Sequence, residues 1–177
     1  MGEPSSSLLI AVADAGPLIH LEEIGQLPLM TLFDKLLLPD AVWDEAVVNG
    51  SVPRASLEQL PCLARTSAVE SEVLRFIQAN SLNDLHRGER ESLFVCSQQS
   101  IPLLLTDDLA VRDAAKRLGL TPVGSLGVIV RAFRCGRLTK FAAEQCLRDL
   151  QSVSSLFVTP AIVEMAIEQL HRGPTQP

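Results

Sequence analysis

The sequence predicts an α/β fold in which a central, mostly parallel sheet is flanked by helices. Two apolar runs, LLIAVA at 8–13 and IPLLLT at 101–106, are typical of parallel strands that are buried on both faces. Segments with helical spacing separate these runs, and such alternation favours crossovers between parallel strands. Right-handed crossovers place the C-terminal ends of all strands at one edge of the sheet. Residues that directly follow the strands are therefore expected to lie near one another.

In the first half of the chain we expect short helices between two or three strands. Pro17 is tolerated in the first turn of a helix, and Gly25 interrupts that helix. Pro39 ends a short strand, and Asp40 can cap the helix that follows. The segment 57–68 leaves open whether it contains a strand. The expected elements are helices at 16–24 and 26–35, a strand at 36–39, a helix at 41–48 and a loop at 49–56.

In the second half, strands continue to alternate with helices until the last two helices. Gly119 and Gly136 follow helical patterns, as glycine commonly does at helix C-termini. The whole chain is expected to be one domain, 1–177, with a C-terminal helical extension at 139–171 and a tail at 172–177. The expected elements are helices at 71–80, 87–99, 108–118, 125–135, 139–150 and 160–171, and strands at 101–106 and 121–123.

Composition excludes several classes of protein. The 177 residues are 47% hydrophobic, with a mean hydropathy of +0.24, which argues against disorder. No apolar run approaches the roughly 18 residues that a membrane span needs. The N-terminus has no basic residue before its short apolar run, unlike a signal peptide. We therefore expect a cytoplasmic protein that does not enter membranes.

The cysteines and histidines give little support to a zinc site. None of the four cysteines forms a CxxC pair. Cys96, Cys135 and Cys146 lie in apolar helical stretches and are expected to pack as small hydrophobic residues. The three histidines are dispersed along the chain, and structural roles are expected for them.

Charge is distributed unevenly along the chain. The net charge is −6, which by itself argues against nucleic acid as a partner. Residues 1–80 contain 11 acidic and 4 basic residues, whereas residues 112–148 contain 8 basic and 2 acidic residues. A basic stripe beside an acidic centre that binds metal would suit a phosphate backbone. The alternative is a solvated helix face.

Acidic residues follow both confident strands. Asp14 ends the first apolar run, and Asp107 and Asp108 end the run that closes with Thr106. Open α/β sheets bind ligands at this edge. Each of these acids could instead cap the helix that follows it. The segment GSLG at 124–127 could likewise offer backbone N–H groups to a phosphate, or Ser125 could be a helix cap.

Two glutamates on helices could complete a carboxylate cluster. Glu45 has Asp44 beside it, so at most one of the two is expected to face inward. Glu89 lies two residues before Glu91, so these two are expected to face in different directions. Clustered carboxylates are tolerated when a divalent cation neutralises them, and Mg²⁺ or Mn²⁺ prefers oxygen ligands. Such sites commonly cut phosphodiesters. The alternative for each of these acids is that it is a solvated surface residue with no role in a site.

Five stretches in order resemble the PIN-domain nucleases and, within them, a toxin-like branch, the VapC-type toxins. They cover about the first 140 residues, and the C-terminal helices match less closely. The stretches are VADAGPLIHLEEIGQLPLM at 12–30, LLLPDAVWDEAV at 36–47, LHRGERESL at 85–93, LLLTDDLAVRDAAKRLGL at 103–120 and PVGSLGVIVRAFRCGRL at 122–138.

The resemblance implies a three-layer PIN-like fold with acids around one or two Mg²⁺ or Mn²⁺ ions. The implied acids are Asp14, then Glu45, then Glu89 with Glu91 as the fallback, and finally Asp107 or Asp108. Asp14, Glu89, Asp107 and Asp108 are the expected metal ligands, with Thr106 placed to hold a metal-bound water. Candidates for contacts with the RNA backbone are Arg87, Arg112 and Lys116.

The function that the resemblance implies is a metal-dependent endoribonuclease, the toxin of a toxin–antitoxin pair. Its expected partners are RNA, a cognate antitoxin protein and a second copy in a homodimer. A catalytically silent PIN-like module that binds RNA or protein is the alternative, and a nuclease acting on DNA is a third. The apolar residues of 20–33 form either a partner surface or plain core.

Overall fold

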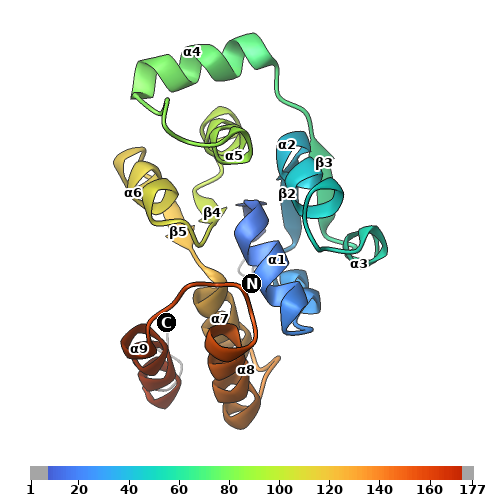
Figure 1. Ribbon diagram of the computed structural model, residues 1–177, viewed down its shortest axis with the longest axis vertical. Coiled ribbons are helices and arrows are strands. Elements are labelled where there is room, and N and C mark those ends of the chain that lie inside the picture. Colours follow the sequence, from blue (N-terminus) through green and yellow to red (C-terminus); the bar gives the residue numbers. More distant parts are fainter. Residues whose placement is uncertain (1–7, 173–177) are drawn as a thin grey trace, which may run out of the picture.

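The computed structural model describes residues 8–172 and has five parallel strands in the order β3-β2-β1-β4-β5 (Figure 1). The fold class predicted from the sequence is therefore confirmed. Val12 pairs with Leu37 on one side of β1 and with Leu104 on the other. The strands are β1 (Ile10–Ala13), β2 (Lys35–Pro39), β3 (Leu63–Thr66), β4 (Leu103–Leu105) and β5 (Thr121–Val123).

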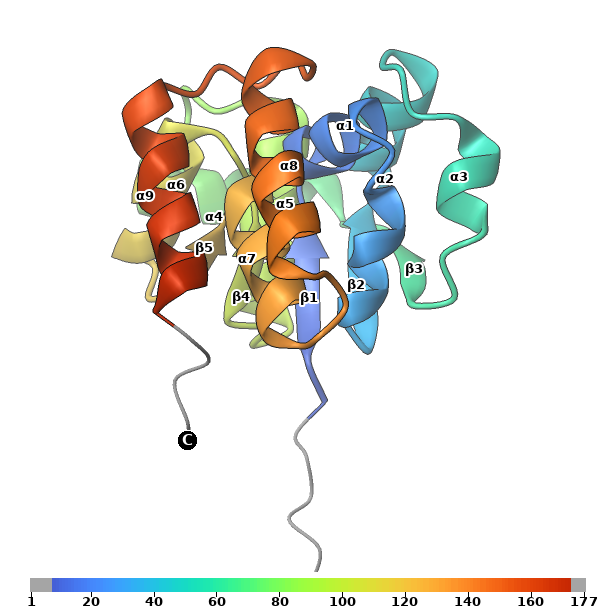
Figure 2. The ribbon, with the colours of Figure 1, turned by 90° about the horizontal axis from the view of Figure 1, so that it is seen from below.

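Helices cover both faces of the sheet, because side chains alternate along each strand (Figures 1 and 2). Ala11 and Ala13 of β1 pack in one apolar cluster, and Val12 packs in another on the opposite face. The first face is covered by α1 (Ala15–Glu23), the 3₁₀ helix η1 (Leu27–Leu32), α7 (Ser125–Arg134), α8 (Lys140–Ser152) and α9 (Pro160–His171). The second face is covered by α4 (Glu70–Asn80), α5 (Arg87–Gln98) and α6 (Leu109–Arg117).

Three segments of the first half differ from the expected elements. The helix predicted at 26–35 is only the 3₁₀ helix η1, because Pro28 lies in its first turn and Lys35 already pairs in β2. The helix predicted at 41–48 is divided into α2 (Asp40–Trp43) and a π-helical turn, η2 (Asp44–Val48). The loop predicted at 49–56 overlaps a short helix, α3 (Arg54–Glu58), and the ambiguous segment after it contains β3.

The C-terminal helices belong to the main core. Leu147 of α8 and Ile167 of α9 pack in the same cluster as β1. Among the residues of 20–33, Leu21, Met30 and Phe33 are buried, so the core interpretation holds for these side chains. Cys96 and Cys146 are buried as expected, but Cys135 is exposed because it lies at the solvent-facing end of α7.

None of the helices in residues 8–172 is both long and apolar enough to cross a membrane. The expectation of no signal peptide concerns residues that lie partly outside the described range, as does most of the expected tail at 172–177.

Candidate active site

Asp14 lies at the C-terminal end of the central strand β1 and is almost wholly buried, with 5% of its surface exposed. It is the N-cap of α1, where its Oδ1 accepts a 2.9 Å hydrogen bond from the N–H of Ala15. Its Oδ2 accepts a 3.0 Å hydrogen bond from the hydroxyl of Thr106. Asp14 therefore does cap a helix, which was the alternative interpretation, but the cap uses only Oδ1, and Oδ2 is bound by Thr106.

The burial of Asp14 changes its acid strength. Desolvation raises the pKa of the carboxyl from 3.8 to about 7, against two hydrogen bonds that lower it. The negative charges of Glu89 and Glu45 add to the rise. These two glutamates are far from Asp14 in the sequence, so the coupling shows that all three carboxylates share one region of the molecule.

Glu45 and Glu89 also act on each other. Burial raises the pKa of Glu45, and the charge of Glu89 raises it further. A Cβ atom added at Gly88 would lie 2.7 Å from Oε2 of Glu45, so the glycine lets this carboxylate lie against the start of α5. Glu89 itself completes a capping box, in which its Oε2 accepts a 2.8 Å hydrogen bond from the N–H of His86.

Asp107 lies at the end of β4, and three groups hold its carboxylate. Its Oδ2 is 2.8 Å from Nδ1 of His20 and accepts a 2.6 Å hydrogen bond from the hydroxyl of Ser125. Its Oδ1 accepts a 2.7 Å hydrogen bond from the N–H of Ser125. Gly124 permits this approach, since an added Cβ would lie 2.6 Å from the same Oδ1. Asp107 therefore joins α1 and α7 across the edge of the sheet.

The structure places the two members of the pairs Asp107/Asp108 and Glu89/Glu91 differently, whereas Asp44 and Glu45 are both exposed. Asp108 is exposed and caps α6, with its Oδ1 accepting a 3.0 Å hydrogen bond from the N–H of Val111. Glu91 is buried, and its Oε2 accepts a 3.1 Å hydrogen bond from the N–H of Ala41 at the start of α2. Asp107 thus contacts α1, and Glu91 anchors α2. The charge of Glu89 adds to the effect of burial on the pKa of Asp14.

The three basic residues predicted to contact phosphates differ in their exposure to solvent. Arg112 is half-buried, and its Nη1 donates a 3.2 Å hydrogen bond to the carbonyl of Thr106. Lys116 lies one turn further along α6 on the same side, and is exposed. Arg87, whose side chain is 75% exposed, pairs with Glu91 at 3.1 Å.

Sequence reasoning missed His20 and Ser125 as site residues. His20 looked like a dispersed structural histidine, and the spacing between it and Asp107 gives no local signal. Ser125 was weighed as a helix cap, but Gly124 is the N-cap of α7, and Ser125 is buried with both its N–H and its hydroxyl on Asp107. The N–H of Ser125, a candidate for binding a phosphate, thus donates to the carboxylate of Asp107 instead.

An apolar groove of about 570 Å³ opens beside Asp107 and Arg112. It runs between the start of α7 and α9, and the segment that joins α8 to α9 borders it. Phe157 is 95% exposed and Met165 is 63% exposed along this groove. Such exposed large apolar side chains in one groove are typical of a surface that another molecule covers.

The residues of the edge suit a divalent cation in charge and in donor type. Within residues 8–172, no three His, Cys, Asp or Glu side chains already form a group that could hold a metal ion. However, Asp14, Glu45 and Glu89 offer oxygen donors. Burial raises the pKa values of Asp14 and Glu45, and repulsion between the carboxylates raises them further. A cation would relieve this repulsion, and Mg²⁺ and Mn²⁺ prefer such donors.

Comparison with protein families agrees with this arrangement. A family model described as a PIN domain matches residues 10–172, which is nearly the whole chain. Neither the curated proteins nor the solved structures gave a match.

Proposed function

Because the chain belongs to the PIN-domain family, whose members are generally nucleases, we propose that it is an endoribonuclease that requires Mg²⁺ or Mn²⁺. One observation supports this most directly. The carboxylate of Asp14 is buried at the end of the central strand, where its pKa rises to about 7 and two further carboxylates act on it. A buried acid in acidic surroundings costs stability, and such arrangements are concentrated at functional sites.

In this proposal Asp14, Glu89 and Asp107 would hold the cation. Asp14 is positioned by Ala15 and Thr106, so its orientation is fixed before any ligand arrives. Asp108, which the sequence also predicted as a ligand, caps α6 through Oδ1 and is not assigned to the ion in this proposal. When bound, a divalent cation would polarise the scissile phosphate and lower the pKa of a water.

Glu45 is the proposed proton acceptor. Its exposed side chain can meet a water at the surface of the site. Partial desolvation of its carboxyl and the charge of Glu89 raise its pKa, so its carboxylate is a stronger base than that of an ordinary glutamate. Taking a proton at a carboxylate oxygen of Glu45 would leave the attacking water more nucleophilic.

Arginine and lysine side chains are proposed to bind the strand. Arg112 uses Nη1 on the carbonyl of Thr106, which fixes its guanidinium beside the acids. Its remaining N–H groups would stabilise the charge that develops on the phosphate. Lys116 and Arg87 are exposed and would contact neighbouring phosphates, so affinity should fall as salt rises.

The test is RNA cleavage with Mn²⁺ by the wild type, Asp14→Asn and a control, Glu70→Gln. Glu70 is an exposed acid at the start of α4, away from the candidate site, so its variant should cut normally. The Asp14→Asn variant should lose at least about 100-fold in rate if its carboxylate holds the ion. Equal cutting by Asp14→Asn and wild type would contradict the assignment. A single-stranded DNA of the same length tests the DNA alternative.

We further propose that the protein is a toxin silenced by an antitoxin protein, whose apolar segment would cover the groove beside Asp107. The exposed side chains of Phe157 and Met165 support this, since a partner with apolar residues would bury them. Induced expression should arrest growth, and Asp14→Asn should abolish the arrest. A small protein encoded next to this chain should restore growth, and the Phe157→Ser, Met165→Ser variant should resist that rescue.

Two other proposals have their own measurements. Three contacts already engage the carboxylate of Asp107, which favours a catalytically silent binding module in which this acid holds no metal ion. Calorimetry with Mn²⁺ distinguishes the module from the nuclease. Absence of Mn²⁺ binding at millimolar metal would support the module. A homodimer is expected from the resemblance, and analytical ultracentrifugation checks it.

A further inference from the structure

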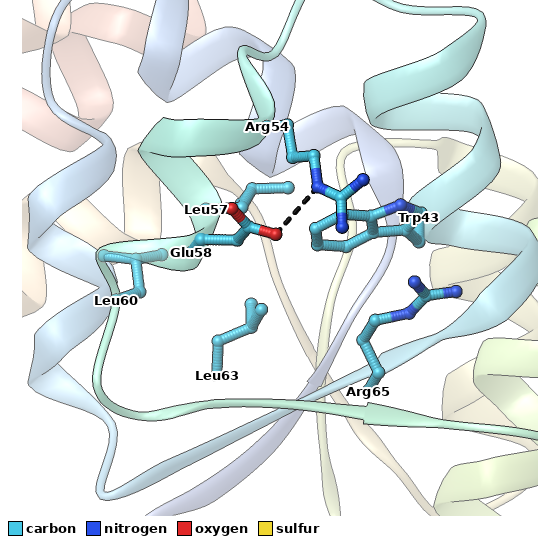
Figure 3. Close-up of a pocket in the computed structure, with 7 residues that line it drawn as sticks. All are labelled: Trp43, Arg54, Leu57, Glu58, Leu60, Leu63 and Arg65. Carbon is cyan, nitrogen blue, oxygen red and sulfur yellow. Dashed lines mark hydrogen bonds and ion pairs between the residues drawn. The ribbon is translucent and has the colours of Figure 1, made fainter.

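A second cleft lies around Trp43, beside the outer strand β3 of the sheet. It has a volume of about 240 Å³ and is bordered by α2, α3 and β3 (Figure 3). None of the acids of the candidate active site lines it. The lining residues are Trp43, Arg54, Leu57, Glu58, Leu60, Leu63 and Arg65.

Two arginines flank the indole of Trp43. The guanidinium carbons of Arg65 and Arg54 are 4.6 and 5.9 Å from the ring centroid, and Figure 3 shows the groups on either side of the ring. Both distances are within the range of cation–π attraction. Trp43 is only 6% exposed, and Leu57 and Leu60 are buried too. The exposed arginines and the half-buried Leu63 therefore form most of the surface that a ligand would meet.

The arginines keep hydrogen-bond donors for a ligand. Arg54 bonds through Nε to Glu58 at 2.7 Å, and its two terminal nitrogens have no hydrogen-bond partner within residues 8–172. Arg65 uses Nε and Nη2 on Asp40, which leaves Nη1. The Arg54–Glu58 pair is exposed, and such i,i+4 pairs are weak, so an incoming anion can displace Glu58.

A series of arginines connects this cleft to the candidate active site. Arg65 binds the carboxylate of Asp40 at 2.6 Å. The pKa of Asp40 is lowered first by its hydrogen bond from Ser67, then by Arg65, and in smaller part by the charge of Arg87. Arg87 also pairs with Glu91, and both residues lie on α5 together with Glu89. Arg87, Arg65 and Arg54 therefore follow one another from the acids to the cleft.

We propose that the cleft around Trp43 is a second RNA subsite, which binds one nucleotide of a strand whose scissile phosphate lies at the acids. Arg54 and Arg65 would bind the phosphate, and the base would lie against Leu63, the half-buried leucine of the lining, and the guanidinium planes. Cationic donors beside apolar surface are what single-stranded nucleic acid binds. The inference rests on the proposed ribonuclease function.

Trp43 is the only tryptophan in the sequence, so its fluorescence reports on the cleft. Titration with a single-stranded RNA in EDTA, where the proposed reaction cannot proceed, should change the emission. The emission should also respond to a mononucleotide more than to inorganic phosphate. An equal response to phosphate would mean that no base is bound and would overturn the proposal. So would a response to a polyglutamate peptide with none to RNA, which would identify an acidic protein as the occupant.

Variants test the arginines separately from folding. The side chain of Arg54 is exposed, so the Arg54→Gln variant should fold normally. For Arg65, which packs on Trp43, the Arg65→Lys variant keeps the charge and is used in place of a neutral substitution. Arg54→Gln should weaken RNA binding about fivefold or more and reduce the salt dependence of binding. Arg75→Gln, an exposed arginine on α4, should bind like wild type.

Cleavage kinetics separate this inference from the proposed function. With a long RNA, Arg54→Gln should raise KM and leave kcat unchanged, and with a dinucleotide it should change neither. Unchanged KM and binding in Arg54→Gln, in a protein that still cuts RNA, would refute the subsite alone. RNA binding at Trp43 in a protein that cuts nothing would refute the nuclease and retain an RNA-binding cleft.

Discussion

The hydroxyl of Thr106 donates a 3.0 Å hydrogen bond to Oδ2 of Asp14, across 92 positions of sequence. Strand register explains the contact. Ala13 pairs with Leu105 in neighbouring parallel strands, so the residues that follow each strand end meet at the same edge. The same hydroxyl lies 3.3 Å from the N–H of Asp108 and accepts from it. One buried side chain thus orients an acid and the start of α6.

Replacing Thr106 with valine should destabilise the protein and weaken metal binding. The change keeps the shape of the side chain but removes the donor to Asp14 and the acceptor for Asp108. Loss of partners for buried polar groups costs about 1–3 kcal/mol. Urea unfolding and Mn²⁺ calorimetry measure the two effects. Thr106→Ser retains the hydroxyl and should approach wild type, and equal losses in both variants would contradict this role.

The metal-free protein should become less stable as pH rises from about 4 to 7. Burial raises the pKa of Asp14 from 3.8 to about 7, so in this window the folded protein holds a proton that the unfolded chain has released. The stabilisation is complete below the unfolded pKa and is lost as pH rises through the folded value. A shift of this size corresponds to about 4 kcal/mol.

The Asp14→Asn variant isolates that effect because its amide does not titrate in this range. In EDTA, its stability relative to wild type should increase with pH and level off above about pH 7. Thermal unfolding between pH 4 and 8 measures the difference. Parallel curves for the two proteins would show that Asp14 does not titrate as inferred.

Strand ends were the part of the site that sequence could place. The apolar runs before Asp14 and Asp107 are long enough to identify buried parallel strands, and parallel strands share an edge, so their meeting follows from topology. The split of the helix at 41–48 and the shortening of 26–35 could not be read from apolar spacing. These changes depend on the pairing of Lys35 and on local backbone geometry.

Side-chain partners across elements were beyond the sequence. Asp107 and Asp108 are adjacent, and only the approach of α7 decides that Asp107 meets Ser125 while Asp108 caps α6. His20 has no local pattern that connects it with Asp107. Glu91 likewise anchors a helix, because the first turn of α2 lies against it and the N–H of Ala41 donates to its carboxylate.

The variants Asp107→Asn and Asp108→Asn should separate the two adjacent acids. Asparagine caps helices about as well as aspartate, so Asp108→Asn should keep both stability and activity. Asp107→Asn replaces an acceptor oxygen with a donor facing the donors of Ser125 and His20, and should lose about 10–100-fold in RNA cleavage. Greater loss in Asp108→Asn would assign the fourth acid to that position.

Replacing Gly88 with alanine should reduce activity more than stability. The new Cβ would lie 2.7 Å from Oε2 of Glu45, and the exposed glutamate can swing away at little cost in folding energy. Alanine also stabilises a helix such as α5 by up to about 1 kcal/mol relative to glycine. The proposed base would nevertheless leave its position, so kcat should fall while the unfolding midpoint stays near wild type. Gly16→Ala is the matched control at the same edge, because its Cβ would meet Asp107 at an ordinary 3.6 Å. If both variants cut RNA at the wild-type rate, the position of Glu45 does not matter to the reaction.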